Sequence, residues 1–290
     1  MTAEAGPTNG AGRAGFMITA VALALSANAA HAQIGDILRR IDPNQIKRGA
    51  QVARQASRDF TEEEEADIGR MVSARILHTY HLAKNDKQQR YVTLVGNTVA
   101  AYSVRPALDW HFAVIETRIV NAFSAPGGFI FITTGALEQI HSEAELANVL
   151  GHEIGHATQK HILKEIKRGN VLSSVKDLAS TTAQGSRLLN DEVGKHIGDF
   201  AYDKLFTTGL SRRDELEADK IGADLASAAG YRTSAFVTFL EGLQKLEGTS
   251  EMKQLTDTHP SPRERIAALK PEINDHGTLL AERFDSWMAR

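Results

Sequence analysis

Two histidines and a glutamate, in the segment His152-Glu153-Ile154-Gly155-His156, have the clearest capacity for chemistry in this sequence. On a helix, residues four apart lie about 40° from each other around the axis, so both imidazoles project from one face and can bind one metal ion. Neutral histidine nitrogen is a ligand of Zn²⁺, and a catalytic zinc site keeps one position open for water. Glu153 adjoins the first ligand, where its carboxylate can act as a general base on that water. The spacing therefore predicts a hydrolytic zinc site.

A third ligand is required, and the segment 211–219 supplies candidates. Ser211 is a favourable N-cap residue, so a helix is expected to begin there. Glu215 and Asp219 are one turn apart and share a face, whereas Glu217 lies about 160° away from both. One carboxylate can bind the metal while the other accepts a hydrogen bond from the second ring nitrogen of a ligating histidine. Alone, this segment is typical of a solvated helix of mixed charge. Paired with the histidines, it is interpreted as the second half of the metal site.

His161 follows His156 by five residues and is a further candidate ligand. On a continuous helix it would lie about 180° from His152 and point away from the metal. The metzincin pattern requires glycine and histidine where this chain has Gln159 and Ile162, so that class is excluded. We therefore interpret His161 as a structural residue.

Capping patterns predict where the helices of this chain begin. Thr61 and Glu64 have the spacing at which the two side chains cap each other, so a helix is expected to begin at Thr61. Ser142 and Glu145 repeat the pattern before the helix that carries the two histidines. A further helical pattern covers about residues 87–104.

Between these helices lies the strand-like part of the chain. The segment Pro126-Gly127-Gly128 is a turn signal. Alternating, β-branched and aromatic residues predict three short antiparallel strands, over 110–116, 118–123 and 129–134. Everything after Gly135 has helical character. The expected fold class is therefore α+β, with a small antiparallel sheet packed beside a helical majority.

Residues 1–32 have the three parts of a secretory signal peptide. Arg13 precedes an apolar run over residues 14–25, and Ala30-His31-Ala32 fits a cleavage site. A disordered alanine-rich tail or an uncleaved anchor is the alternative. The order of the three parts favours cleavage before Gln33 and export to a bacterial periplasm. Residues 33–60 are then a lead-in segment and residues 61–290 a single domain, with no later stretch apolar enough to span a membrane.

The composition excludes several classes of protein. Lys and Arg number 33 against 36 for Asp and Glu, a formal charge of −3, which gives no electrostatic case for nucleic-acid binding. The chain has no cysteine, so disulfides, cysteine nucleophiles and thiolate metal sites are absent. An apolar content of 42% is sufficient for a buried core. Histidine and carboxylate remain as the metal ligands.

Taken together, these motifs resemble the zincin metallopeptidases of peptidase family forty-eight, the group that contains HtpX and the CAAX prenyl proteases. The resemblance implies a mostly helical, gluzincin-type fold and one Zn²⁺ per chain, bound by His152, His156 and Glu215. It implies that Glu153 is the catalytic base and that Asp219 supports the ligands. The matching segments occur in the family's order, as Asn121-Ala122-Phe123, Pro126-Gly127-Gly128, His152-Glu153-x-x-His156, Ser211-Arg212-x-x-Glu215-x-x-Ala218-Asp219 and His259-Pro260.

The predicted function is that of a zinc-dependent metalloendopeptidase acting on exported or envelope proteins, including unfolded, misfolded and outer-membrane ones. We expect the substrate to add as a β-strand along Gly128, Phe129, Ile130 and Phe131, because such binding reads the main chain more than the side chains. One alternative is a chaperone-like or adaptor protein with a closed, latent zinc site. Glu153 argues against it, since a structural zinc site needs no base. A zinc hydrolase of another bond, such as a cell-wall amidase, also remains open.

The segment Thr258-His259-Pro260-Ser261-Pro262-Arg263-Glu264-Arg265 is the last candidate. Its prolines stiffen a loop and can begin a helix, and alone it would be interpreted as a surface turn. The resemblance implies that His259 and Arg265 lie near the metal. As a donor beside Arg265, His259 would stabilise the oxyanion. As a fourth zinc ligand, it would displace water and hold the enzyme latent. We expect one loop to serve both roles.

Overall fold

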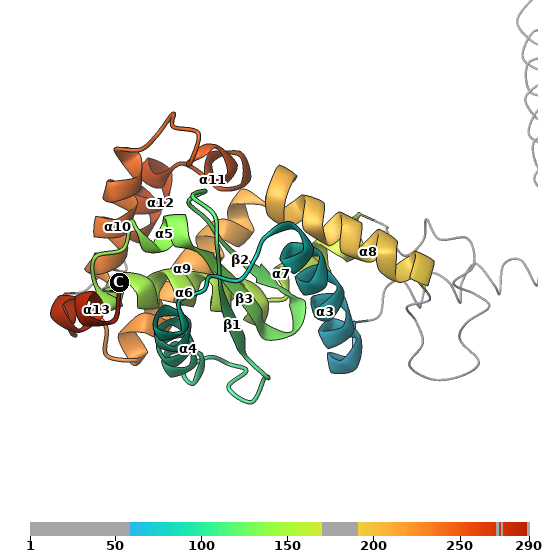
Figure 1. Ribbon diagram of the computed structural model, residues 1–290, viewed down its shortest axis with the longest axis horizontal. Coiled ribbons are helices and arrows are strands. Elements are labelled where there is room, and N and C mark those ends of the chain that lie inside the picture. Colours follow the sequence, from blue (N-terminus) through green and yellow to red (C-terminus); the bar gives the residue numbers. More distant parts are fainter. Residues whose placement is uncertain (1–58, 170–190, 271–272, 274, 289–290) are drawn as a thin grey trace, which may run out of the picture. The chain divides into compact units, whose positions relative to one another are not determined.

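The computed structural model describes residues 59–169, 191–270, 273 and 275–288 (Figure 1). The predicted signal peptide and almost all of the predicted lead-in segment lie outside the described residues and stay predictions. Within the described part, no helix is both long and apolar enough to cross a bilayer. The strands are β1 (His111–Ile115), β2 (Ala122–Ala125) and β3 (Phe129–Thr133). The α-helices are α3 (Glu62–Thr79), α4 (Asp86–Ala100), α5 (Thr134–Leu137), α6 (Glu143–Thr158), α7 (His161–Arg168), α8 (Asp191–Asp203), α9 (Arg212–Ala228), α10 (Ser234–Gln244), α11 (Lys253–Thr258), α12 (Pro262–Leu269) and α13 (Ala281–Met288).

The predicted caps begin α3 and α6. The Thr61 hydroxyl accepts from the Glu64 backbone N–H at 3.2 Å, and the Glu64 carboxylate accepts from the Thr61 N–H at 2.9 Å, so the box is complete. At α6, the Ser142 hydroxyl accepts from the Glu145 N–H at 3.2 Å. The Glu145 carboxylate accepts instead from the N–H of His141, one residue earlier than a capping box requires. Both helix starts are confirmed.

The sheet has the strand order β1-β3-β2 and is mixed. The α+β class is confirmed, but the expectation that all three strands pair antiparallel is wrong for one of the two pairs. β2 and β3 form an antiparallel hairpin through the turn Pro126–Gly128, whereas β1 pairs parallel with β3. The chain reverses after β1 and again after β2, and β3 rather than β2 lies beside β1. Residue alternation identifies strands but does not choose their neighbours.

The expected substrate strand is also corrected. β3 is the central strand, with Phe129–Thr133 paired to β1 and Phe129–Ile132 paired to β2. Both of its edges are therefore occupied, and Phe129, Ile130 and Phe131 have no free edge at which to add a substrate. Gly128 lies in the preceding turn, with φ of 88°. The pairing leaves an outer edge on β2.

Helices cover both faces of the sheet (Figure 1). Ile130 and Ile132 pack on one face into a core shared with α4 and α6. Phe123 and Phe131 pack on the other face into a core shared with α3, α7 and α8. Because successive residues of a strand point to opposite faces, β3 takes part in both cores. The sheet therefore fixes α6, the helix of the paired histidines, against β2.

Glu65 on α3 binds three segments that are distant in the sequence, at Arg105, Gly127 and Lys160. Its buried carboxylate accepts from the Arg105 guanidinium at 2.7 and 3.2 Å, from Lys160 Nζ at 2.9 Å and from the Gly127 N–H at 3.2 Å. Burial alone would raise the pKa of Glu65, but the hydrogen bonds from Arg105 and Lys160 outweigh burial and hold the pKa below its ordinary value. The ionised carboxylate thus links α3, the β2–β3 turn and the residues that follow α6.

Glu65→Gln is expected to lower the free energy of unfolding by about 2–3 kcal/mol at pH 7, because buried donors lose a charged partner. The pKa of Glu65 is lower in the folded protein than its ordinary value of 4.5, so the ionised carboxylate stabilises the fold above about pH 4.5. That contribution is lost as the pH falls through the folded pKa. The difference between the variant and the wild type should therefore shrink in urea unfolding below pH 4.5. Glu62→Gln, at an exposed position of the same turn, is the control. An equal loss in both variants would contradict the assignment.

Candidate active site

Helices α6 and α9 cross at backbone contact, and this crossing builds the site. A Cβ added at Gly151 would lie 2.7 Å from the Gly222 carbonyl oxygen, and one added at Gly155 would lie 3.2 Å from the Ala218 carbonyl oxygen. Larger residues would push the helices apart, since such approaches are closer than normal packing permits. The crossing was not predicted from the sequence, although the i, i+4 spacing of Gly151 with Gly155 and of Ala218 with Gly222 signals a close helix contact.

The crossing brings His152, His156 and Glu215 together as predicted. The two imidazole Nε2 atoms are 3.0 Å apart, and the Glu215 carboxylate oxygens lie 3.7 Å from His152 Nε2 and 3.6 Å from His156 Nε2. Three donors at about 2.0–2.1 Å from one tetrahedral ion would be about 3.3 Å apart, so the spacing fits a zinc-sized cation. Glu215 Oε2 is buried and has no hydrogen-bond partner among the described residues. That orphan oxygen also fits a cation.

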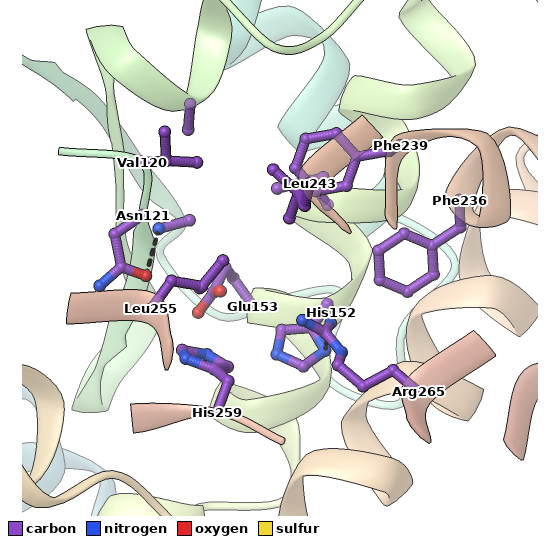
Figure 2. A pocket seen from close by; sticks show the side chains of 13 residues that line it. Val120, Asn121, His152, Glu153, Phe236, Phe239, Leu243, Leu255, His259 and Arg265 are labelled. Carbon is purple, nitrogen blue, oxygen red and sulfur yellow. Dashed lines mark hydrogen bonds between the residues drawn. The ribbon is translucent and has the colours of Figure 1, made fainter. Parts of the chain in front are cut away.

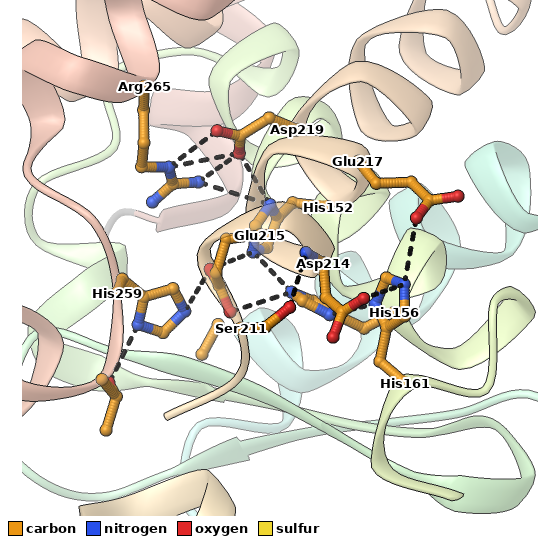
Figure 3. A network of polar contacts seen from close by, with 12 residues as sticks. His152, His156, His161, Ser211, Asp214, Glu215, Glu217, Asp219, His259 and Arg265 are labelled. Carbon is orange, nitrogen blue, oxygen red and sulfur yellow. Dashed lines mark hydrogen bonds and ion pairs between the residues drawn. The ribbon is translucent and has the colours of Figure 1, made fainter. Parts of the chain in front are cut away.

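Asp219 and Arg265 lie behind His152 (Figure 3). His152 Nδ1 is 2.8 Å from Asp219 Oδ1, and the Arg265 guanidinium donates to the same carboxylate at 2.6 and 2.9 Å. Burial raises the pKa of Asp219, but Arg265 and His152 outweigh burial and hold the pKa well below its ordinary value. The ionised carboxylate accepts a hydrogen bond from the His152 Nδ1–H, so the Nε2 lone pair is free to face the metal. The geometry thus supports the support role predicted for Asp219.

Arg265 lies next to a candidate metal ligand, in the neighbourhood that the resemblance implied. Its guanidinium is buried against Asp219 and lies 3.3 Å from His152 Nδ1. The oxyanion donor predicted beside it was His259, and the contacts of Arg265 itself are those of a residue that holds the Asp219 carboxylate. Helix α12 positions it, beginning at Pro262 with Ser261 as its N-cap.

His259 reaches the site from the loop that precedes α12. Its Nε2 atom lies 3.5 Å from Glu215 Oε2, and its Nδ1 atom lies 2.9 Å from the Thr258 hydroxyl. Burial lowers the pKa of His259 well below its ordinary value, so the imidazole is neutral and has a lone pair to offer. The distance to Glu215 is that between two ligands of one ion. This geometry is compatible with a fourth ligand and with a nearby donor.

Glu153 lies beside these groups without joining the three-ligand cluster. One donor atom each from His152, Glu153 and His259 lie within 4.8 Å of one another. Burial raises the pKa of Glu153 to about 8, with Arg265 opposing the rise. A carboxyl that titrates near neutral pH can both accept and return a proton.

A small pocket of about 30 Å³ opens next to Glu153 (Figure 2). Val149, one turn before Glu153 on α6, lies on its wall together with Phe236 and Leu243 of α10. The wall is predominantly apolar. A second, more polar hollow is lined by His156, Glu215 and Lys204, among others. Glu153, His259 and Ala122 line both.

His161 is placed differently from the expectation. Helix α6 ends at Thr158, and Lys160 adopts the left-handed conformation with φ of 56°, so α7 begins at His161 in a new direction. The His161 ring is fully buried, and its Nδ1 lies 2.8 Å from His156 Nδ1. The prediction that it points away assumed a continuous helix and is wrong. His161 still lies outside the cluster of His152, His156 and Glu215.

Comparison with known proteins agrees with this geometry. The model of Peptidase family M48 matches residues 86–273, well over half of the chain. The chain belongs to peptidase family M48. The resemblance seen in the sequence is thereby confirmed.

Several curated proteins are similar to this M48 chain. The mitochondrial metalloendopeptidase OMA1 of Arabidopsis thaliana is 35% identical over 171 residues, which cover 59% of this chain and 33% of that protein. The beta-barrel assembly-enhancing protease of Escherichia coli K12 is 26% identical over 204 residues, covering 67% and 40%. The OMA1 of Schizosaccharomyces pombe is 29% identical over 197 residues, covering 68% and 55%. The chain thus spans between a third and about half of the length of these relatives.

Full-length protein freed of metal and then dialysed with Zn²⁺ is expected to retain about one ion per chain by elemental analysis, because three ligands and one open position make one site. Glu215→Ala should weaken binding by more than the roughly 10–100-fold typical of losing an outer-shell partner, since it removes a ligand. Asp224→Asn, at an exposed position on the same helix, is the control. Equal zinc retention in all three proteins would show that Glu215 is not a ligand.

Proposed function

We propose that this protein is a zinc metalloendopeptidase that hydrolyses peptide bonds in extended segments of exported or envelope polypeptides. The observation that carries the proposal is the buried donor cluster of His152, His156 and Glu215 with Glu153 beside it. A structural site would need the ligands but no buried carboxyl of raised pKa next to them. Membership of a peptidase family supports the same reaction class.

Each residue of the site has a separate role in the proposed hydrolysis. Bound to His152, His156 and Glu215, Zn²⁺ would supply a Lewis acid that polarises the scissile carbonyl. Glu153 takes a proton from the attacking water and later delivers it to the leaving amine. His259, once its loop moves away from Glu215, is able to donate to the developing oxyanion.

The substrate is expected along β2 rather than β3. The Thr133 N–H donates to the Asn121 carbonyl at 3.1 Å, and antiparallel pairing alternates, so the backbone groups of Ala122 and Ser124 point to the outer edge. The Ala122 N–H there donates to Asn121 Oδ1 at 3.0 Å, a bond that an added strand would replace. Ala122 lines both hollows beside Glu153. An extended peptide added at this edge would pass in front of the general base.

The direction of that peptide assigns the apolar pocket to one side of the scissile bond. A peptide antiparallel to β2 runs from the Ser124 end toward the Ala122 end. The pocket of Val149, Phe236 and Leu243 lies at the Ala122 end and would take the side chain that follows the scissile bond. Glu153 lines the same pocket, where it can reach the leaving amine. We therefore expect cleavage before an apolar residue, of the kind that becomes exposed when proteins unfold.

The proposed location is the periplasm, on the evidence of the predicted signal peptide. The E. coli relative is named for beta-barrel assembly and the other two for mitochondria, so names alone do not decide location. Cell fractionation and N-terminal sequencing test this, with Gln33 as the expected first residue. Met1 at the terminus of a membrane-bound protein would contradict it.

A latent, chaperone-like protein is the second candidate, and the position of His259 favours keeping it. Its Nε2 lies 3.5 Å from Glu215 Oε2, a spacing that two ligands of one ion would have. A permanently closed site would bind polypeptide without cutting it.

Glu153→Gln is expected to retain zinc and to lose roughly 10²–10⁴-fold in kcat on casein, because the carboxylate carries the proton and is not a ligand. Wild-type activity should disappear with a chelator and return with Zn²⁺. Mass spectrometry of the products should place an apolar residue after the cleaved bond. Near wild-type turnover by Glu153→Gln would refute the mechanism, and binding of casein without cleavage by the zinc-loaded wild type would favour the second candidate.

His259→Ala separates the two roles of the loop. If His259 serves mainly as a fourth ligand, basal cleavage of an unfolded substrate should rise. If it serves mainly as an oxyanion donor, kcat should fall by about 10²–10³-fold. The short distance from His259 Nε2 to Glu215 leads us to expect raised basal cleavage at low substrate together with a lowered maximal rate. An unchanged rate with unchanged zinc affinity would assign the loop a structural role.

A further inference from the structure

His161 forms a second polar chain behind the site, on the side away from Asp219 (Figure 3). Its Nδ1 lies 2.8 Å from His156 Nδ1. Its Nε2 lies 3.8 Å from an Asp214 oxygen and 3.7 Å from a Glu217 oxygen. The ring is fully buried, and Nε2 has no hydrogen-bond partner within the described residues. No step described above uses these contacts.

The positions of the protons on His156 and His161 follow from the way in which His156 would bind the metal. If His156 binds the metal through Nε2, its single proton is on Nδ1 and is donated to His161 Nδ1. His161 Nδ1 must then be the acceptor, so a neutral His161 carries its proton on Nε2. That N–H faces the carboxylates of Asp214 and Glu217, whose charges favour it there although the distances exceed a hydrogen bond.

We propose that His161 is a positioning residue that sets the tautomer and orientation of His156. The negative charges of Asp214 and Glu217 lie near the other ring nitrogen of His161 and favour a proton there. This inference rests on the proposed zinc function, because it needs His156 as a ligand. It gives the second ligating histidine the kind of support that Asp219 gives to His152. Both Nε2 lone pairs are then directed to one point before the metal arrives.

A second cation between His161, Asp214 and Glu217 is the competing interpretation. One donor atom from each lies within 4.8 Å of the others. To bind a cation, His161 Nε2 would need a lone pair, and its proton would move to Nδ1, opposite the His156 Nδ1 proton. Two protons cannot occupy a 2.8 Å contact between two nitrogens. The tautomers required by the first site therefore exclude the second one.

Zinc titration of the metal-free, full-length chain tests the inference. His161→Leu keeps bulk but removes the acceptor, and should weaken Zn²⁺ binding about 10–100-fold. His161→Asn places an amide oxygen near the Nδ1 position and should restore most of the affinity. Glu217→Gln should weaken binding less, and Asp224→Asn, also on α9, should leave it unchanged. Histidine ¹⁵N–¹H spectra of the zinc-loaded wild type should show a proton on Nδ1 of His156 and on Nε2 of His161.

The outcomes are separable. Equal zinc affinity in the wild type, His161→Leu and His161→Asn overturns the inference, as does an equal loss in both variants, which would indicate a packing defect. Two zinc ions per wild-type chain, with one lost in Glu217→Gln, would establish the second cation site instead. A wild-type chain that binds no zinc overturns the proposed function and this inference together. One ion per chain with Asn rescue supports both.

Discussion

The close crossing of α6 and α9 is the constraint on which the site depends. Donors on two helices can share one ion only if they reach a common point about 2 Å from each. With glycine at 151 and 222 and alanine at 218, the helix backbones meet without side chains between them. Glu215 then reaches the two histidines, and Asp219, one turn along, reaches the back of His152.

Charge is the second constraint on this arrangement. Glu153, Glu215 and Asp219 are all buried around the histidines, and Arg265 is the buried cation that faces them. Arg265 is committed to Asp219, so burial raises the pKa of both Glu153 and Glu215. A divalent ion would offset the charge of an ionised Glu215. Without a cation, burying these carboxyl groups at the helix crossing would cost free energy. A bound cation would offset that cost.

The order of the strands in the small sheet positions β2 next to the site. Paired with β1 at one edge and with β2 at the other, β3 has no edge left for docking, and β2 lies beside Glu153. Ala122 of this edge strand and Glu153 line the same apolar pocket. In the proposed mode of binding, strand order rather than any single side chain would set the position of the substrate.

Local chemistry in the sequence was sufficient for part of this description. The spacing of His152 with His156, the shared face of Glu215 and Asp219, and the helix starts at Thr61 and Ser142 follow from residues within one or two helical turns, where geometry is nearly invariant. The tertiary structure decided the rest. A left-handed Lys160 ended the helix that would have turned His161 away, and strand order put the outer edge on β2 instead of β3. The fold also placed Arg265 against the Asp219 carboxylate, a contact that the sequence did not predict. Each of these features depends on which distant segments become neighbours in the fold. Local sequence periodicity does not determine those contacts.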